Sequence, residues 1–154
     1  MQGSDIKNNI KLIRNRIRES CQKVDRDPSS VEIVAVTKYV NAKRIKEAWD
    51  EGIRIFSENY IQEAESKIAH IDFPVRWHLT GHLQKNKVQK AIQIFNMIQS
   101  VDSVALAQLM NDRLEKCATL RSGSLPVLLE MRVRGEDAKY GFDEDALEEA
   151  YLMI

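Results

Sequence analysis

Residues 31–38 read Val-Glu-Ile-Val-Ala-Val-Thr-Lys, an apolar run rich in β-branched residues that ends at Lys38. Such a run, with little polar alternation, is typical of a strand buried on both faces, as in a parallel sheet covered by helices. Lys38 would then lie at the carboxyl end of this strand, where α/β folds bind ligands, and an amine held there against apolar walls has its charged form disfavoured. The run therefore predicts a strand that ends in a lysine, and a lysine at such a place can attack carbonyls. On this run alone, the preferred interpretation is a lysine that ends the strand and reaches solvent.

Helical and extended patterns alternate along the rest of the chain. The first helix is predicted at residues 6–24, where isoleucines recur at spacings of three and four. Further strands are predicted at residues 53–56, 75–79, 97–101 and 126–133. Helices are predicted from Asn41 to Gly52, from Ser57 or Glu58 to a point before Pro74, and around residues 88–95, 106–114 and 143–153.

This order predicts an α/β fold in which one helix precedes five strand-and-helix units with parallel crossovers. An open doubly wound sheet and a (β/α) barrel both fit the pattern. No Gly-x-Gly-x-x-Gly follows the first strand and no Walker loop is present, which disfavours nucleotide sites of those two types.

Composition predicts a single soluble domain over residues 1–154, because 44% of the residues are hydrophobic. Lysine plus arginine equals aspartate plus glutamate at 23 each, so no overall positive field attracts nucleic acid or an anionic membrane. Cys21 and Cys117 stand far apart without CxxC spacing, which favours a reducing, cytoplasmic setting. No apolar run approaches the ~18 residues of a membrane span.

Polar residues follow several predicted strands, where a barrel gathers its site. Asn59 either orients a ligand or sits in the first turn of a helix. His78 and His82 are four residues apart, but the predicted strand and Gly81 argue against the helix that this spacing needs for a metal. We therefore expect no metal, and His82 is expected to cap a turn.

Several motifs resemble those of the pyridoxal phosphate homeostasis proteins, in the same order and spacing. They are residues 35–38 (Ala-Val-Thr-Lys), 56–63 (Phe-Ser-Glu-Asn-Tyr-Ile-Gln-Glu), 77–87 (Trp-His-Leu-Thr-Gly-His-Leu-Gln-Lys-Asn-Lys), 100–103 (Ser-Val-Asp-Ser), 125–128 (Leu-Pro-Val-Leu) and 139–142 (Lys-Tyr-Gly-Phe). That family is similar to the barrel domain of alanine racemase. The resemblance implies a (β/α)8 barrel of which about five units are present here.

The resemblance also implies the ligand and its site. Lys38 matches the lysine that carries pyridoxal 5′-phosphate as an internal aldimine, and Asn59, His78, Met131 and Lys139 are the further cofactor-binding candidates. No catalytic residue and no metal ligand is expected, because the family is thought to buffer the cofactor and hand it to apoenzymes that depend on it. Two alternatives stay open, a racemase-like enzyme and a remnant that binds no cofactor.

The chain departs from the family pattern at several points. Ser57 stands where the family has glycine, and Tyr140 where it has a small serine. A complete barrel needs ~250 residues, and the family's phosphate-binding groups lie on its later strands. We therefore expect a fragment, or a variant without the last three strands, that exposes the fifth strand's edge and self-associates through it.

Overall fold

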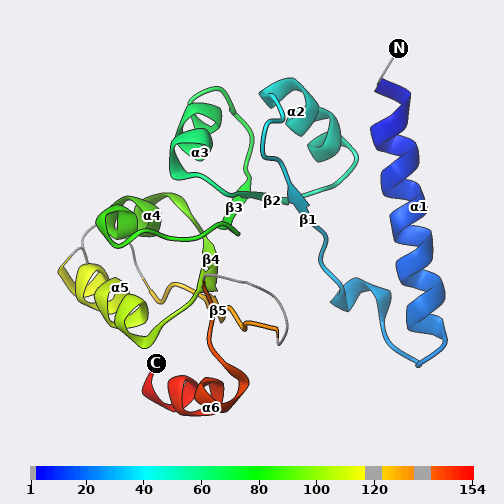
Figure 1. Ribbon diagram of the computed structural model, residues 1–154. Coiled ribbons are helices and arrows are strands. Elements are labelled where there is room, and N and C mark those ends of the chain that lie inside the picture. Colours follow the sequence, from blue (N-terminus) through cyan, green and yellow to red (C-terminus); the bar gives the residue numbers. More distant parts are fainter. Residues whose placement is uncertain (1–2, 117–122, 134–139) are drawn as a thin grey trace.

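Five parallel strands form one sheet in the order β1-β2-β3-β4-β5. The computed structural model describes residues 3–116, 123–133 and 140–154. The strands are β1 (Val34–Val36), β2 (Ile55–Glu58), β3 (Arg76–Leu79), β4 (Met97–Val101) and β5 (Val127–Leu129). They follow an arc in Figure 1, so the sheet has a convex and a concave face.

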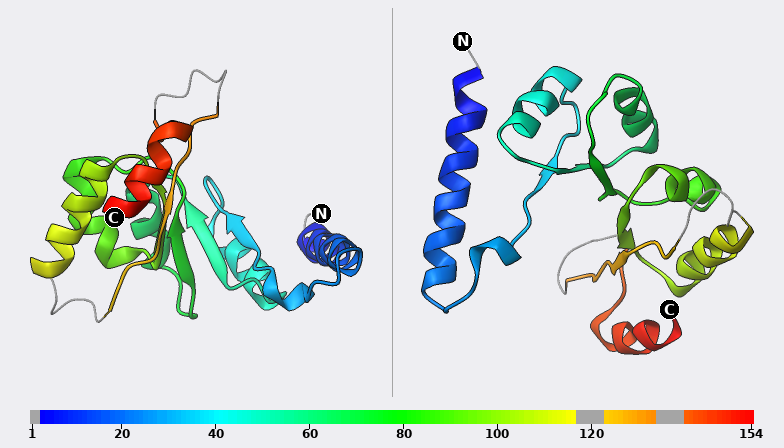
Figure 2. Two further views of the ribbon diagram at one scale, coloured as in Figure 1. Left: turned by 90° about the horizontal axis from the view of Figure 1, so that it is seen from below. Right: turned by 180° about the vertical axis from the view of Figure 1, so that it is seen from behind.

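Four helices connect successive strands and lie on the convex side of the arc: α2 (Ala42–Asp50), α3 (Ile61–Ile68), α4 (Val88–Ile94) and α5 (Val104–Lys116). Helix α1 (Gly3–Gln22) precedes β1 and α6 (Glu144–Met153) follows β5, and two short 3-10 helices are η1 (Pro28–Ser30) and η2 (Lys85–Lys87). α2, α3, α4 and α5 cover the sheet, whereas α1 stands beside α2 at the first edge (Figures 1 and 2).

The strand order settles the choice between the two predicted architectures. Each strand pairs with its predecessor, and the order never reverses. A doubly wound sheet needs a reversal that places helices on both faces. The α/β prediction is confirmed, and the architecture is the (β/α) barrel type, present as five units.

Strand bounds differ most from the predictions in the first, second and fifth strands. The run at residues 31–38 contributes only Val34–Val36 to the sheet. The prediction that this strand is buried on both faces is wrong, since Val36 is 54% exposed. β1 is an edge strand with one partner and faces open space on the concave side. Ser57 and Glu58 end a strand rather than begin a helix, and β5 stops at Leu129, four residues before the predicted end.

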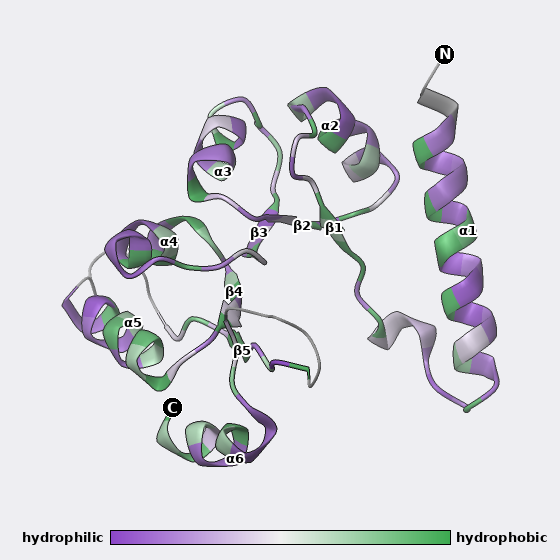
Figure 3. Ribbon diagram, viewed as in Figure 1, coloured by the Kyte–Doolittle hydropathy of each residue, from purple (hydrophilic) through white to green (hydrophobic). Residues whose placement is uncertain are grey.

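The hydrophobic core lies between the convex face and its helices. Phe56, Trp77, Leu79 and Ile98 point from the strands toward Ile45, Ala64, Ala91 and Leu106 of the helices, and all are buried. In Figure 3 the strands carry both hydrophobic and hydrophilic residues, and hydrophilic residues run along the outer sides of the helices. Residues of the convex face therefore form the hydrophobic core, and the concave face is the one left open to a ligand.

Local signals at the helix ends are confirmed. The Asn41 side chain accepts a hydrogen bond of 3.0 Å from the Arg44 amide, and Gly52 adopts φ 88° just past α2. Cys21 is a buried free thiol, and Cys117 lies outside the described residues. Within the described part of the chain, no helix is both long and apolar enough to cross a bilayer.

Candidate functional site

Lys38 lies in a tight turn directly after β1. The turn is closed by a 2.9 Å hydrogen bond from the Val40 amide to the Thr37 carbonyl, and Tyr39 takes φ 63° at its third position. A left-handed backbone is uncommon for a bulky residue and marks a conformation held by its surroundings. Lys38 itself is exposed, so the predicted apolar walls around its amine are absent. The reason is that β1 is an edge strand.

Three charged side chains of β2 and α3 form hydrogen bonds to this turn: Glu58, Glu63 and Lys67. We refer to them as the turn-support cluster. The Lys67 ammonium donates 2.7 Å hydrogen bonds to Glu58 Oε1, Glu63 Oε1 and the Thr37 carbonyl. The Thr37 hydroxyl donates to Glu58 Oε1 at 2.6 Å, and the Tyr39 amide donates to Glu63. Burial alone would raise the pKa of Glu63, but the hydrogen bonds from Lys67 and Tyr39 outweigh it and lower the pKa.

Asn59 follows β2 at the same edge of the sheet as Lys38. The register pairs Val36 with Ser57, so Lys38 and Asn59 each come two residues after paired positions. Asn59 Oδ1 accepts a 3.1 Å hydrogen bond from the Thr80 hydroxyl. Gly81 packs against the Asn59 backbone, and a Cβ at Gly81 would lie 2.2 Å from the Asn59 carbonyl oxygen. Asn59 therefore belongs to a strand end, not to the first turn of a helix.

His78 is buried on β3, in register with Ser57. Its Nδ1 lies 2.9 Å from Gln99 Nε2. Burial lowers the pKa of His78, the nearby Arg76 lowers it further, and Glu32 acts in the opposite direction. His78 is therefore a neutral hydrogen-bonding group near pH 7.

Ser57 lies between Val36 and His78 in the sheet, and its side chain is fully buried. Within the described part of the chain its hydroxyl has no hydrogen-bond partner. An unpaired buried hydroxyl is unfavourable and calls for an explanation. Ser57 lies on β2, between β1, which precedes Lys38, and β3, which carries His78.

A cleft of about 520 Å³ opens beside Asn59, between the loops that follow β2 and β3. His82 lines it and pairs through Nδ1 with Asp102 Oδ2 at 3.0 Å. The Tyr140 ring stacks on His82 with the ring centroids 3.6 Å apart. His82 thus links the loops after β3, β4 and β5, which the expectation of a turn cap did not include. Among the described residues, no group of three His, Cys, Asp or Glu side chains is placed to hold a metal.

Met131, another predicted site residue, lies at the other side of the arc. Met131 follows β5, is about half exposed and forms an isolated parallel bridge with Phe142. Three strand intervals separate β5 from β2, roughly 14 Å at the usual spacing. Met131 therefore does not contact the strand ends that carry Lys38 and Asn59. Lys139 lies outside the described residues.

The residues present fit one side of the cofactor site that the family resemblance implies. Three polar groups lie at or near the carboxyl ends of three successive strands. They are the accessible Lys38 amine after β1, the Ser57 hydroxyl without a hydrogen-bond partner on β2, and the buried neutral His78 imidazole on β3. The amine suits bond formation with an aldehyde, and the other two groups suit hydrogen bonding to a polar ring. The predicted trio Lys38, Asn59 and His78 is thus brought together, while Met131 stands apart.

Sequence reasoning missed the turn-support cluster and the His82–Asp102 pair. Glu63 and Lys67 are four residues apart on a helix, a spacing that indicates an ion pair. Nothing in the sequence indicates that Lys67 turns inward to the strand end. His82 and Asp102 are twenty residues apart, and only the pairing of β3 with β4 brings them together.

Comparison with known proteins gives consistent results. A sequence profile described as "Alanine racemase, N-terminal domain" matches residues 4–154. The pyridoxal phosphate homeostasis protein of Pseudomonas aeruginosa is 38% identical over 158 residues, an alignment that takes in 98% of this chain and 66% of that protein. The chain thus spans slightly less than two thirds of that relative's length.

Solved structures share the fold. An unknown protein from Bifidobacterium adolescentis superposes with a TM-score of 0.86 at 26% identity, over 98% of this chain and 64% of its own. PipY of Synechococcus elongatus, solved with PLP bound, superposes with a TM-score of 0.70 at 33% identity, over 90% of this chain and 65% of its own.

Proposed function

Because this chain belongs to the alanine racemase N-terminal domain family, we propose that it binds pyridoxal 5′-phosphate through Lys38 as a carrier without turnover of its own. The observation that carries the proposal is the Lys38 amine, presented in a fixed turn beside Asn59 and His78. The names of its curated relatives and the PLP-bound structure of PipY support it. We propose residues 1–154 as a single domain that delivers the cofactor to apoenzymes.

The chemistry needs a neutral amine and a nearby aldehyde. When bound, the cofactor supplies that aldehyde. Lys38 Nζ would hold the cofactor through a reversible covalent bond to that aldehyde carbon. Lys38 is exposed, so its amine is accessible to a ligand from solvent, which suits a carrier that must release its ligand.

The other residues have supporting roles in this proposal. Asn59 borders the cleft between the loops after β2 and β3 and positions the ligand by hydrogen bonding. His78, held neutral, presents an uncharged edge to the ligand ring. Met131 supplies an apolar contact from the far side of the mouth, and Lys139, which follows it in sequence, adds a positive charge for the phosphate.

A racemase-like enzyme is the second candidate, and the His82–Asp102 pair is the observation that favours it. A histidine oriented by a carboxylate is a common acid–base pair. Stacking by Tyr140 buries one face of that imidazole, however, and leaves it as a link between loops. We expect no interconversion of L- and D-alanine by the chain loaded with pyridoxal phosphate, measured by chiral chromatography.

The decisive experiment is a spectroscopic titration with pyridoxal phosphate. The unmodified chain should develop a visible absorption band, and Lys38→Ala should abolish it. Lys43→Ala removes an exposed lysine of the neighbouring α2 and serves as the matched control, with the band retained. Borohydride reduction followed by peptide mass spectrometry should place the cofactor on Lys38. A band that survives in Lys38→Ala, or reduction onto another lysine, contradicts the proposal.

A further inference from the structure

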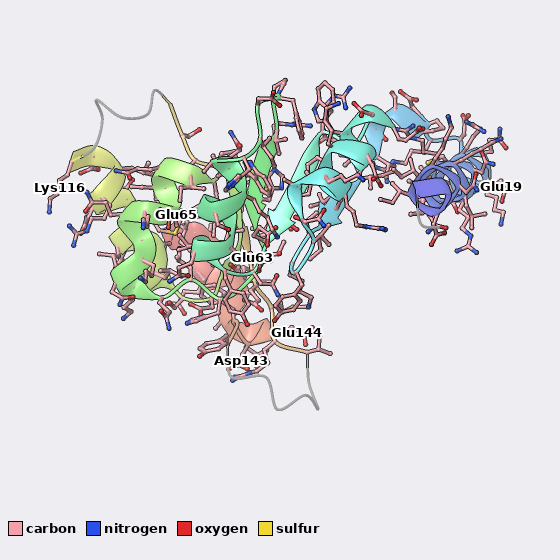
Figure 4. The ribbon with its side chains drawn as sticks, turned by 90° about the horizontal axis from the view of Figure 1, so that it is seen from above. Glu19, Glu63, Glu65, Lys116, Asp143 and Glu144 are labelled. Atoms are coloured by element: carbon pink, nitrogen blue, oxygen red, sulfur yellow. The ribbon has the colours of Figure 1, made fainter. Side chains whose placement is uncertain are left out.

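The turn-support cluster is buried to an unusual degree for three charged groups. The side chains of Glu58, Lys67 and Glu63 are 0%, 9% and 19% exposed. Glu63 comes from the first turn of α3 and is labelled in Figure 4. Two carboxylates share one ammonium, and within the described chain Glu58 Oε2 has no hydrogen-bond partner.

Stability alone does not account for such a cluster. Taking ions out of water carries a large desolvation penalty, and replacing a buried ion pair by apolar residues is often neutral or stabilising. Glu58 and Lys67 lie on the convex side, where the surrounding strand and helix residues form the hydrophobic core. Apolar side chains would fit that environment, so the charges require another explanation.

The bonds of the cluster converge on the residues that flank Lys38. Glu58 and Lys67 bind the hydroxyl and the carbonyl of Thr37, and Glu63 binds the amide of Tyr39. Tyr39 is left-handed, a conformation that costs a bulky residue free energy unless the surroundings enforce it. The Lys38 side chain is exposed, so burial does not fix its orientation. The backbone on both sides of Lys38 therefore fixes the position from which its side chain extends.

We propose that Glu58, Glu63 and Lys67 are positioning residues that hold the turn at residues 37–40 in the conformation that presents the Lys38 amine. This inference rests on the proposed function, since it concerns how that amine is presented. Lys67 is the central member because it neutralises both carboxylates and binds the turn directly.

Removing the ammonium should disturb the turn in a defined way. In Lys67→Met the two carboxylates repel each other, and Glu63, the less buried one, moves toward solvent and releases the Tyr39 amide. Hydrogen exchange at the Tyr39 and Val40 amides should accelerate at least tenfold. The rate at which pyridoxal phosphate reacts with Lys38 should fall about tenfold, and Lys67→Arg should restore part of both effects.

The matched control is Lys90→Met. Lys90 pairs with Glu65 of the same helix α3 at 2.7 Å, but this exposed pair does not touch the turn. The control should change neither amide exchange nor Lys38 reactivity. Urea unfolding of each variant gives its folded fraction, and a purely structural role would not alter the reactivity of Lys38 relative to Lys43 in folded protein.

The outcomes separate the two proposals. Unchanged exchange at Tyr39 and Val40 in folded Lys67→Met, with unchanged Lys38 reactivity, overturns the positioning role. If the unmodified chain does not react with pyridoxal phosphate, the proposed function fails, and amide exchange together with acylation of Lys38 still decides the positioning role. Should Lys67→Met not fold, Glu63→Gln replaces it, because that variant keeps the shape and weakens the bonds to Tyr39 and Lys67.

Discussion

His78 shows how one buried residue makes the site sensitive to pH. Its imidazole sits among strands and hydrogen-bonds to Gln99, and burial lowers its pKa, with Arg76 adding to the effect. An unfolded histidine titrates near pH 6.5. Between that value and the lower pKa of the folded state, the unfolded chain binds more protons. The contribution of His78 to stability is therefore complete above about pH 6.5 and is lost as the pH falls toward the folded value.

We expect the free energy of unfolding to decrease between pH 7 and pH 5, with a slope from His78 of at most about 1.4 kcal/mol per pH unit. His78→Gln keeps a hydrogen-bonding side chain but does not titrate, so this part of the slope should vanish. Urea titrations at several pH values measure it. His70→Gln, at an exposed position, is the control and should keep the slope. An equal slope in His78→Gln and the unmodified chain would show that other groups cause it.

Gly81 is a second single residue that shapes the site, at the cleft between the loops after β2 and β3. A Cβ there would meet the Asn59 carbonyl oxygen at 2.2 Å, a clash with backbone that no side-chain rotation relieves. Gly81→Ala must push apart the loops after β2 and β3, and overpacking of this kind costs about 1–3 kcal/mol.

We therefore expect Gly81→Ala to lower the free energy of unfolding by about 2 kcal/mol and to weaken ligand binding beside Asn59. Gly123→Ala separates this steric effect from backbone strain. Gly123 has φ 95° and open space around its Cβ position, so that variant reports strain alone and should leave binding unchanged. Urea unfolding and the spectroscopic titration measure the two quantities. Equal binding by both variants contradicts the close-approach argument.

At the scale of elements, short helices and strands hold their positions through specific ends. α2 has nine residues, too few to be stable alone, and depends on its Asn41 cap and on the burial of Ile45. α1 is longer but less well covered, since Ile10 is buried whereas Ile13 is 43% exposed. Its predicted isoleucine stripe is thus only partly used, because α1 packs mainly beside α2 and η1.

Asn41→Ala should destabilise the chain by about 1 kcal/mol, because the Arg44 amide loses its acceptor at the start of α2. Asn8→Ala, an exposed position inside α1, is the comparison and should be neutral or slightly stabilising because alanine favours helix. Midpoints of thermal unfolding measure both. Equal losses would mean that the cap contributes nothing beyond helix propensity.

At the scale of the whole molecule, the five strands form an arc with an open concave face and two edges. Val36 on β1 and Leu128 on β5 are half exposed, and Leu152, Met153 and Ile154 at the end of α6 are exposed apolar residues as well. Exposed apolar faces and unpaired strand edges are sites of association. Figure 2 shows the sheet from its side, with both edges uncovered by other strands.

We expect these 154 residues to self-associate at micromolar concentrations. Val36→Lys with Leu128→Lys should shift the distribution toward monomer, since charges at the two edges oppose strand pairing. Lys substitution at Leu12, an exposed position of α1, is the control and should have no effect. Sedimentation velocity over a range of concentrations measures the state. A monodisperse monomer throughout contradicts this prediction.

Much of the fold follows from local patterns in the sequence. Residue periodicity indicates the five strands and six helices in their order, and β4 is predicted with its observed bounds. The caps at Asn41 and Gly52 are also readable, because they depend on neighbouring residues alone. The motif around Lys38 identifies the candidate amine, which the structure places at the sheet edge with Asn59 and His78.

Other features depend on residues that are distant in the sequence. The barrel-type order, the exposure of Lys38 and the ends of β1 and β5 follow from which strands pair and which remain at the edges. Lys67 is buried because α3 lies across the end of β1, and His82 meets Asp102 because β3 pairs with β4. Periodicity reports which face of an element is apolar, but not which charged groups come together across elements. Those contacts depend on strand register and on how the sheet curves, and both are properties of the assembled fold.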